Sequence, residues 1–153
     1  MEFTINVVPR TKKNSQQIIF SKGRRLIIPS KSYQQFEKDC LKQIPDKYRN
    51  GISSPVNIKA VFYVKDRRRV DLTNLLEALD DMLVKADVIE DDCRDIIVGH
   101  DFSRVYHDKD NPRIEVEITE VKGEYEVWRT TKWNKCNENF KIKKQQRMKQ
   151  KTL

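Results

Sequence analysis

The sequence predicts an α+β fold in which a mixed β-sheet packs against two helices. Residues 56–64 and 112–121 alternate apolar and polar side chains, which is typical of strands that bury one face. Residues 30–44 and 71–86 instead repeat their apolar side chains at helical spacing. The expected order is strand, hairpin, helix, strand, helix, strand, strand, which fits this fold class.

The first part of the chain is expected to hold a strand, a hairpin and a helix. Residues 3–8 alternate apolar side chains, as a strand does. Residues 16–28 hold two β-rich runs around Gly23, which indicates a hairpin with glycine in its turn. Ser32 and Gln35 have the spacing of a capping box, so we expect the first helix to begin there.

The remaining elements are a strand, a second helix and two further strands. The second helix is expected from Asp71 to about Ala86, because leucines recur along one face. Asp71 stands where a side-chain oxygen can accept from the free N–H groups of the first turn. Residues 94–106 and 112–121 are expected to form the last two strands.

The net charge of +8 is unevenly distributed over the 153 residues. Residues 122–153 contain ten Lys or Arg and three Glu, whereas residues 1–121 are nearly balanced. We therefore expect a folded domain of residues 1–121, followed by a basic and partly disordered extension of residues 122–153. The extension favours a polyanionic partner such as nucleic acid, although a solubilising tail would have the same composition.

Cysteine spacing and hydropathy exclude several classes of protein. Cys40, Cys93 and Cys136 form no CxxC motif, so a zinc site is not expected. No apolar run is long enough to span a membrane, and the amino-terminal residues are too few and too polar for a signal peptide. The expected setting is the reducing cytoplasm, without a membrane partner.

The segment 65–92 carries opposite charges at its two ends. Arginines occupy positions 67–69, and carboxylates occupy positions 90–92. A helix of about 16 residues is roughly 24 Å long, so the helix itself holds Asp71 and Asp92 apart. The two can meet if the chain doubles back beside the preceding strand, or if a second protomer supplies one of them.

Carboxylates that meet in this way would need a cation, because like charges at close range repel. Oxygen ligands from Asp71, Asp91 and Asp92 suit Mg²⁺. The ion would activate a water and stabilise the departing 3′ oxygen of a phosphodiester, while the arginines contact phosphate. The alternative is that Asp71 is a helix cap and both charged runs are solvated loops.

The run "RRRVDLTNLLEALDDMLVKADVIEDD" resembles the signature of the RusA family of Holliday junction resolvases. That signature is an arginine run, Asp-Leu-Asp-Asn-Leu, an amphipathic helix and a paired-Asp turn. The segment "VVPRTKKNS", the hairpin and the closing strand "RIEVEITEV" follow in the order of the family, so the resemblance covers about residues 3–121.

This resemblance implies a homodimeric, Mg²⁺-dependent endodeoxyribonuclease with a RusA-like fold. Such an enzyme is a phosphodiester hydrolase that resolves four-way branched DNA by paired symmetric nicks, in recombination and repair. It leaves 5′-phosphate and 3′-hydroxyl ends. Family members often occur in prophages, so a bacterial or phage-encoded protein is expected.

Carried over by position, the family's site falls on Asp71, Asn74, Asp91 and Asp92. The three carboxylates would bind Mg²⁺ and serve catalysis, and Asn74 would orient a ligand or water. The expected DNA contacts are Arg67, Arg68, Arg69, Lys12, Lys13 and Asn14.

Two positions depart from the family's pattern. Thr73 replaces an Asp, and Glu77 replaces a Lys. Positions 73 and 77 are neighbours on one helix face, so we hypothesise that Glu77 supplies the metal ligand lost at position 73. Alternatively, Glu77 is an exposed helix residue. The departures leave open a non-catalytic or weakly catalytic binder of structured DNA, or a metal-dependent nuclease for another branched substrate.

Other residues carry weaker signals. His100 lacks an obvious nucleophile or ligand partner, which favours a structural or surface role. Arg24 and Arg25 at the hairpin tip could reach a phosphate or a partner subunit, although a solvated tip is the favoured interpretation. Trp128 and Trp133 lie among lysines, where they could pack on the body or stack on bases.

Overall fold

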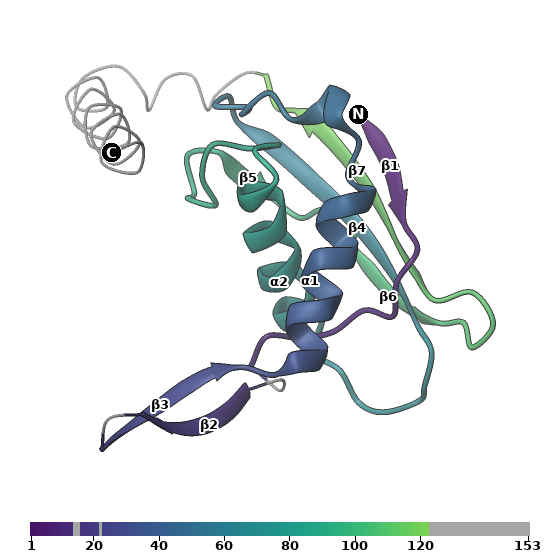
Figure 1. Cartoon of the computed structure of the whole chain (residues 1–153). Coiled ribbons are helices and arrows are strands. Elements are labelled where there is room, and N and C mark those ends of the chain that lie inside the picture. Colours follow the sequence, from purple (N-terminus) through teal and green to yellow (C-terminus); the bar gives the residue numbers. More distant parts are fainter. Residues whose placement is uncertain (14–15, 22, 123–153) are drawn as a thin grey trace. The chain divides into compact units, whose positions relative to one another are not determined.

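One mixed β-sheet and two helices make up the body of the protein, which confirms the predicted α+β class. The structure is a computed structural model that describes residues 1–13, 16–21 and 23–122. Residues Met1–Glu120 form one unit (Figure 1). The predicted basic extension falls almost wholly on residues 123–153, outside the described residues.

The strand β4, Val56–Val64, lies at the centre of the sheet. On one side it pairs antiparallel with β7, Arg113–Glu120, which in turn pairs with β1, Glu2–Ile5. On its other side it pairs in parallel with two short strands, β5, Ile97–Gly99, and β6, Arg104–His107. The order β1-β7-β4-β5, with β6 also on β4, is therefore mixed.

One face of the sheet is buried and the other is solvated. Along β4, buried and partly exposed residues alternate, so that Ile58 and Phe62 are fully buried while Lys59 points to the other face. Both helices lie over the same face of the sheet (Figure 1), and Leu79 of the second helix is fully buried in the same core.

The first helix, α1, spans Lys31–Gln43. Its N-cap is Ser30, whose Oγ accepts from the Tyr33 N–H at 3.2 Å. The predicted start at Ser32 is therefore wrong by two positions. Ser30 takes the role because it directly precedes the first helical residue and has extended backbone angles.

The second helix, α2, spans Leu72–Lys85, close to its predicted bounds. Asp71 is the N-cap residue, and its carbonyl accepts from the Leu75 N–H at 3.3 Å. Within the described residues, however, its side chain bonds no backbone N–H of the first turn. It accepts instead from Asn74 Nδ2 at 3.0 Å, so the predicted side-chain cap is wrong.

The chain doubles back after α2, as expected. An isolated bridge joins Ile52 to Ile89, after which β5 and β6 run parallel to β4. The single strand predicted over 94–106 is in fact these two strands, separated by a turn in which the Ser103 N–H donates to the His100 carbonyl at 3.2 Å. Phe102 in this turn has a φ of 65°, which no regular strand allows.

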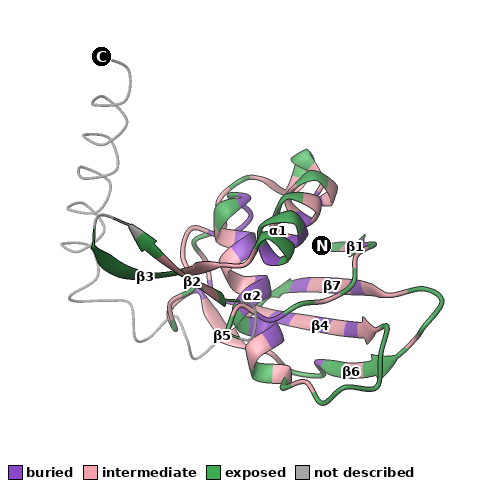
Figure 2. Ribbon diagram, turned by 60° about the horizontal axis from the view of Figure 1, so that its bottom comes forward, coloured by how far each residue is buried: buried purple, intermediate pink, exposed green. Residues whose placement is uncertain are grey.

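The predicted hairpin is present as β2, Gln16–Ser21, and β3, Arg24–Pro29. Gly23 has a φ of 73° in the turn, a conformation that glycine adopts without strain. The hairpin forms its own two-stranded sheet, which projects from the body (Figure 1), and most of its described residues are exposed (Figure 2).

Across residues 1–13, 16–21 and 23–122, no helix is both long enough and apolar enough to cross a bilayer.

Candidate metal and DNA-binding site

The loop between β4 and α2 presents the predicted arginines to solvent. Arg67, Arg68 and Arg69 are all exposed. The Arg68 guanidinium bonds Asp66 of the same loop, with 2.6 Å between Nη2 and Oδ2, and this hydrogen bond lowers the pKa of Asp66. Because the loop leads directly into Asp71, the arginines and that carboxylate lie at the same end of the sheet.

A basic hollow of about 450 Å³ lies between this loop and the segment that follows β1. Arg10 lines the hollow from the first segment, and Lys65, Arg68 and Arg69 line it from the loop. Asp66 also lines it and pairs with Arg68, so cations outnumber the one carboxylate. Several cations around one hollow create a positive potential that attracts phosphate. The hollow extends to Val70, the residue before Asp71.

Arg10 was not among the predicted site residues. It lies directly after Pro9 in the segment that resembles the family's amino-terminal motif. That position was the available signal, but sequence spacing alone does not place residue 10 opposite residue 68. Tertiary packing brings the two segments together.

Asp71 and Asn74 form a contact at the start of α2. Asp71 is exposed, and it accepts from Asn74 Nδ2 as described above. An ionised carboxylate has two oxygens and about four acceptor positions, so one bond to Asn74 leaves capacity for other ligands. The structure therefore brings together two of the residues predicted to form one site.

Two predicted DNA contacts form ion pairs with the exposed edge of α2. Lys12 Nζ contacts Asp81 Oδ2, and Lys13 Nζ lies 3.3 Å from Glu77 Oε2. The hydrogen bond to Asp81 raises the pKa of Lys12. Asp81 was not predicted, although its spacing of four residues from Glu77 places both on one helix face.

Asp91 and Asp92 lie beyond the other end of α2. The Asp92 N–H donates to Asp91 Oδ1 at 2.9 Å. Burial, followed by a hydrogen bond and the charge of Asp91, raises the pKa of Asp92 above its usual 3.8, and the charge of Asp81 adds to the rise. This pair of carboxylates would be relieved of repulsion by a cation.

The length of α2 separates the two predicted halves of the site within one chain. Its 14 residues span about 21 Å. Asp71 follows the last residues of β4, whereas Asp92 precedes Ile96, whose carbonyl accepts from the first residue of β4, Val56, at 2.7 Å. The return of the chain beside β4 thus begins at the end of the sheet remote from Asp71.

The side chains present fit Mg²⁺ in kind but not in number within one chain. Asp71, Asp91 and Asp92 offer the hard oxygen ligands that this ion prefers. Yet among residues 1–13, 16–21 and 23–122 of a single chain, no group of three His, Cys, Asp or Glu side chains could hold a metal ion. The two halves of the predicted site therefore stay apart within the described residues of one chain.

His100 has a structural partner that the sequence did not reveal. Its Nδ1 lies 3.0 Å from the Ile58 carbonyl, and its Nε2 lies 3.1 Å from Asp80 Oδ2. Burial lowers the pKa of His100, but the hydrogen bond and charge of Asp80 outweigh it, so the pKa is raised. An imidazolium donates to both acceptors, and it thereby ties the middle of α2 to β4.

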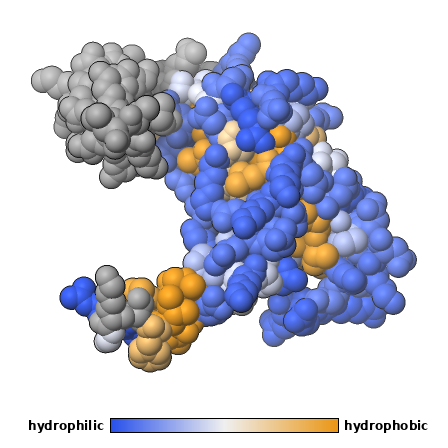
Figure 3. Space-filling view, viewed as in Figure 1, coloured by the Kyte–Doolittle hydropathy of each residue, from blue (hydrophilic) through white to orange (hydrophobic). Residues whose placement is uncertain are grey.

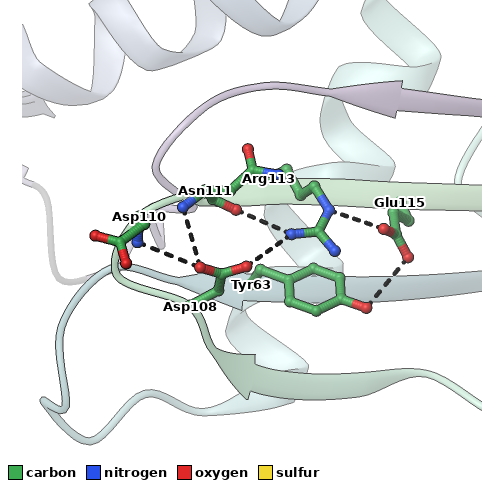
Figure 4. Close-up of polar contacts among 6 residues, drawn as sticks. All are labelled: Tyr63, Asp108, Asp110, Asn111, Arg113 and Glu115. Atoms are coloured by element: carbon green, nitrogen blue, oxygen red, sulfur yellow. Dashed lines mark hydrogen bonds and ion pairs between the residues drawn. The ribbon is translucent and has the colours of Figure 1, made fainter.

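A second polar cluster lies on the solvated face of the sheet, where β4, β7 and the β6–β7 loop meet (Figure 4). Arg113 bonds Glu115 at 2.8 Å and Asp108 at 3.0 Å, and its guanidinium lies 3.5 Å from the centre of the Tyr63 ring. The Asn111 carbonyl accepts from the same guanidinium at 3.0 Å. These mutual contacts anchor the loop between β6 and β7, which is a structural role.

Three residues with predicted contacts lie outside the described residues. They are Asn14, expected at the DNA, and the tryptophans Trp128 and Trp133. Their predicted roles stay predictions.

Taken together, the mixed sheet, the basic hollow and the carboxylates around α2 have the features of a protein that acts on the phosphodiester backbone of nucleic acids. The sequence model of the family described as endodeoxyribonuclease RusA matches residues 6–119, so the chain belongs to this family. The match confirms the resemblance seen in the sequence.

Membership establishes the class of activity. The protein is an endodeoxyribonuclease and Holliday junction resolvase, and nucleases of this family are metal-dependent and act on branched DNA. A search of curated proteins gave no match.

Proposed function

We propose that this protein is a Mg²⁺-dependent homodimer that resolves four-way DNA junctions by paired symmetric nicks. The observation that carries the proposal is the exposed Asp71 carboxylate beside the basic hollow of Arg10, Lys65, Arg68 and Arg69. A phosphate held in the hollow would lie next to the start of α2. A dimer suits the substrate, because a four-way junction is two-fold symmetric.

Each metal site would take its ligands from both protomers. Asp71 of one chain would meet Asp91 and Asp92 of the other, because the length of α2 keeps these groups apart within one chain. When bound, Mg²⁺ supplies charge neutralisation and an activated water for attack on the phosphodiester. Burial, followed by the contact with Asp91, raises the pKa of Asp92, and a bound cation would favour the ionised form of this pair.

The other site residues would position the substrate. Asn74 donates to Asp71 and would hold that carboxylate in one orientation. The arginines of the loop would hold the phosphate backbone, joined by Lys12, Lys13 and Asn14 from the amino-terminal segment. Phosphate contacts of this kind fix the register of the nucleic acid and carry no sequence information.

The proposal is tested by cleavage of a synthetic four-way junction with Mg²⁺. The wild-type protein should give paired nicks, and Asp71→Asn should cleave at least about 100-fold more slowly, because one charged ligand is lost. Junction binding by Asp71→Asn should persist, since Asp71 repels phosphate. Equal cleavage by the two proteins would contradict the proposal.

Glu77 is proposed to compensate for Thr73. Its carboxylate is half exposed, and it faces Lys13 at 3.3 Å, on the helix edge that also carries Asp81. We expect Glu77→Gln to weaken Mg²⁺ binding, measured by calorimetry, and to slow cleavage. Unchanged Mg²⁺ affinity together with unchanged cleavage would show that Glu77 is an ordinary exposed residue.

Two alternatives follow from the departures at positions 73 and 77. The protein could bind junctions with weak or no cleavage, or it could cut another branched substrate such as a flap. Competition among labelled junction, flap, duplex, single strand and RNA, with and without Mg²⁺, separates these cases by affinity and by product.

A further inference from the structure

The β2–β3 hairpin exposes large apolar side chains that the proposed site does not use. Cross-strand pairing sets Ile18 opposite Ile27 and Phe20 opposite Arg25, on one face of the hairpin. The exposed fractions are 50% for Ile18, 79% for Phe20 and 61% for Ile27. On the opposite face, Leu26 is 43% exposed. Figure 3 shows apolar surface gathered on the hairpin, whereas the visible face of the body is mostly hydrophilic with smaller apolar areas.

A hairpin of this composition is poorly stable when it is alone in water. Two strands without a third strand or a covering helix have marginal stability, and contiguous exposed apolar surface marks an interaction site. In the part of the chain that the structure describes, β2 and β3 pair with each other and with no further strand. The apolar faces therefore call for a partner beyond the described residues.

We propose that this hairpin is a dimerisation arm that packs against the same hairpin of a second copy of the chain. The arm comprises the described residues 16–21 and 23–29. The inference deepens the homodimer of the proposed function and rests on it. A two-fold contact between identical arms is isologous, so each apolar face meets a surface of the same chemistry.

The charges on the arm favour an antiparallel arrangement of the two copies. From base to tip, one face carries Gln16 with Pro29, then Ile18 with Ile27, then Phe20 with Arg25. In antiparallel packing the isoleucine rows meet at the two-fold axis, and each tip meets the uncharged base of the other arm. A parallel arrangement would instead bring the arginines of the two tips together, and like charges repel.

The same residues fit DNA less well than they fit a second arm. Phosphates require cations or hydrogen-bond donors, and the middle of the arm offers isoleucine side chains. Arg24 and Arg25 at the tip carry the charge suited to phosphate. The experiment below would detect DNA contact by the arm as a separate outcome.

The test compares two exposed phenylalanines in the full-length protein. Phe20→Asp places a charge in the arm, and Phe102→Asp places one on the β5–β6 turn, where the wild-type residue is 71% exposed. Aspartate tolerates the positive φ of residue 102, so the control variant should fold. Molecular mass is measured by light scattering over a range of concentrations, without DNA or Mg²⁺, and circular dichroism verifies folding.

We expect the wild type and Phe102→Asp to be dimers, and Phe20→Asp to raise the dimer dissociation constant at least about 30-fold, the effect of losing a central interface residue. In addition, Ile27→Cys should form a disulfide-linked dimer on mild oxidation, beyond any formed by the wild type or by Phe102→Cys. This second variant keeps the test valid if the aspartate substitution perturbs the hairpin.

The dimerisation arm would be contradicted if the wild type were monomeric, or if Phe20→Asp dimerised as tightly as the wild type. Loss of junction binding by Phe20→Asp while the dimer persists would also contradict it, and would make the arm a DNA contact. Because mass is measured without substrate, these results are independent of the Asp71→Asn cleavage assay. Failure of the arm is thus distinguishable from failure of the nuclease proposal.

Discussion

The two ends of α2 differ in charge and in the side chains that surround them. At its amino-terminal end, Asp71 is a carboxylate beside a basic hollow, with Asn74 as its neighbour. At its carboxyl-terminal end, Asp91 and Asp92 form an acidic pair, and the pKa of Asp92 is raised. The first end presents cations and one carboxylate, whereas the second presents two carboxylates.

This difference suggests that each end is half of a site. Mg²⁺ typically uses one or two carboxylates together with phosphate, so the two ends supply complementary parts. A rigid helix of 14 residues prevents them from joining within one chain. The chain thereby couples metal binding to assembly, if the two ends meet across a dimer as proposed.

The largest expected effect comes from mixing two inactive variants. Asp71→Asn and Asp92→Asn should each fail to cleave a junction, but co-expressed chains should regain cleavage. A mixed dimer has one site with both substitutions and one intact site, so random assembly restores about a quarter of the wild-type sites. Cleavage is measured with a labelled junction.

The products distinguish this result from simple contamination. A mixed dimer should nick one strand of a junction without the paired second cut, whereas residual wild-type protein would make paired cuts. The double variant Asp71→Asn/Asp92→Asn, co-expressed with the wild type, serves as the control. If the mixture of single variants stays inactive, each site lies within one chain or elsewhere.

A smaller effect is expected from charges at the two ends. Arg68→Ala should weaken junction binding roughly 5-fold at physiological salt and reduce the salt dependence by about one counterion. Arg94→Ala is the matched control, because Arg94 is 93% exposed, as Arg68 is 87% exposed, but lies at the acidic end. Titrations at several salt concentrations give both slopes. Equal losses of junction affinity in the two variants would contradict the proposal that phosphate binds at the Asp71 end of α2 and metal at the Asp92 end.

The smallest effect concerns the contact that fixes the middle of α2. Removing a half-buried hydrogen-bonding partner costs about 1–3 kcal/mol, so His100→Gln should lower the free energy of unfolding by that order. The pKa of His100 is raised above its usual 6.5 by Asp80. The charged contact therefore stabilises fully below pH 6.5, and its contribution is lost as pH rises through the folded-state pKa.

Thermal unfolding of the wild type and His100→Gln between pH 5.5 and pH 9 checks this expectation. The difference between them should be larger at acid pH and should shrink as the pH rises. Asp80→Asn, which keeps the shape of the side chain and removes its charge, should lack the pH-dependent part. A difference that grows with pH would mean that the neutral imidazole is the stabilising form.

Local patterns predicted most of the fold. The alternation of residues 56–64 gave β4 with its observed bounds, and the leucine spacing after Asp71 gave α2 to within one residue at each end. Three local details were wrong. The cap of α1 is Ser30, and the Asp71 side chain contacts Asn74 instead of capping α2. The strand expected over 94–106 is broken by a turn at Phe102, whose backbone hydrogen bond the side-chain pattern does not reveal.

The sequence allowed candidate site residues to be proposed, but it did not predict their geometry. Asp71 and Asn74 are three positions apart in one helical turn, so their contact follows from local spacing. The pairing of Lys12 with Asp81 joins residues 69 positions apart, and Arg10 faces Arg68 across a hollow. Such contacts depend on how β1 and the loop before α2 pack, which no short window of sequence contains.

The sequence by itself determined the elements, the charged ends of the segment 65–92 and the family, because periodicity and motif are properties of neighbouring residues. Tertiary structure decided that Asp71 and Asp92 lie beyond opposite ends of α2, and that the β2–β3 hairpin leaves its apolar faces exposed. The physical reason is that a helix is stiff along its axis, while the direction in which the chain returns depends on packing against the sheet.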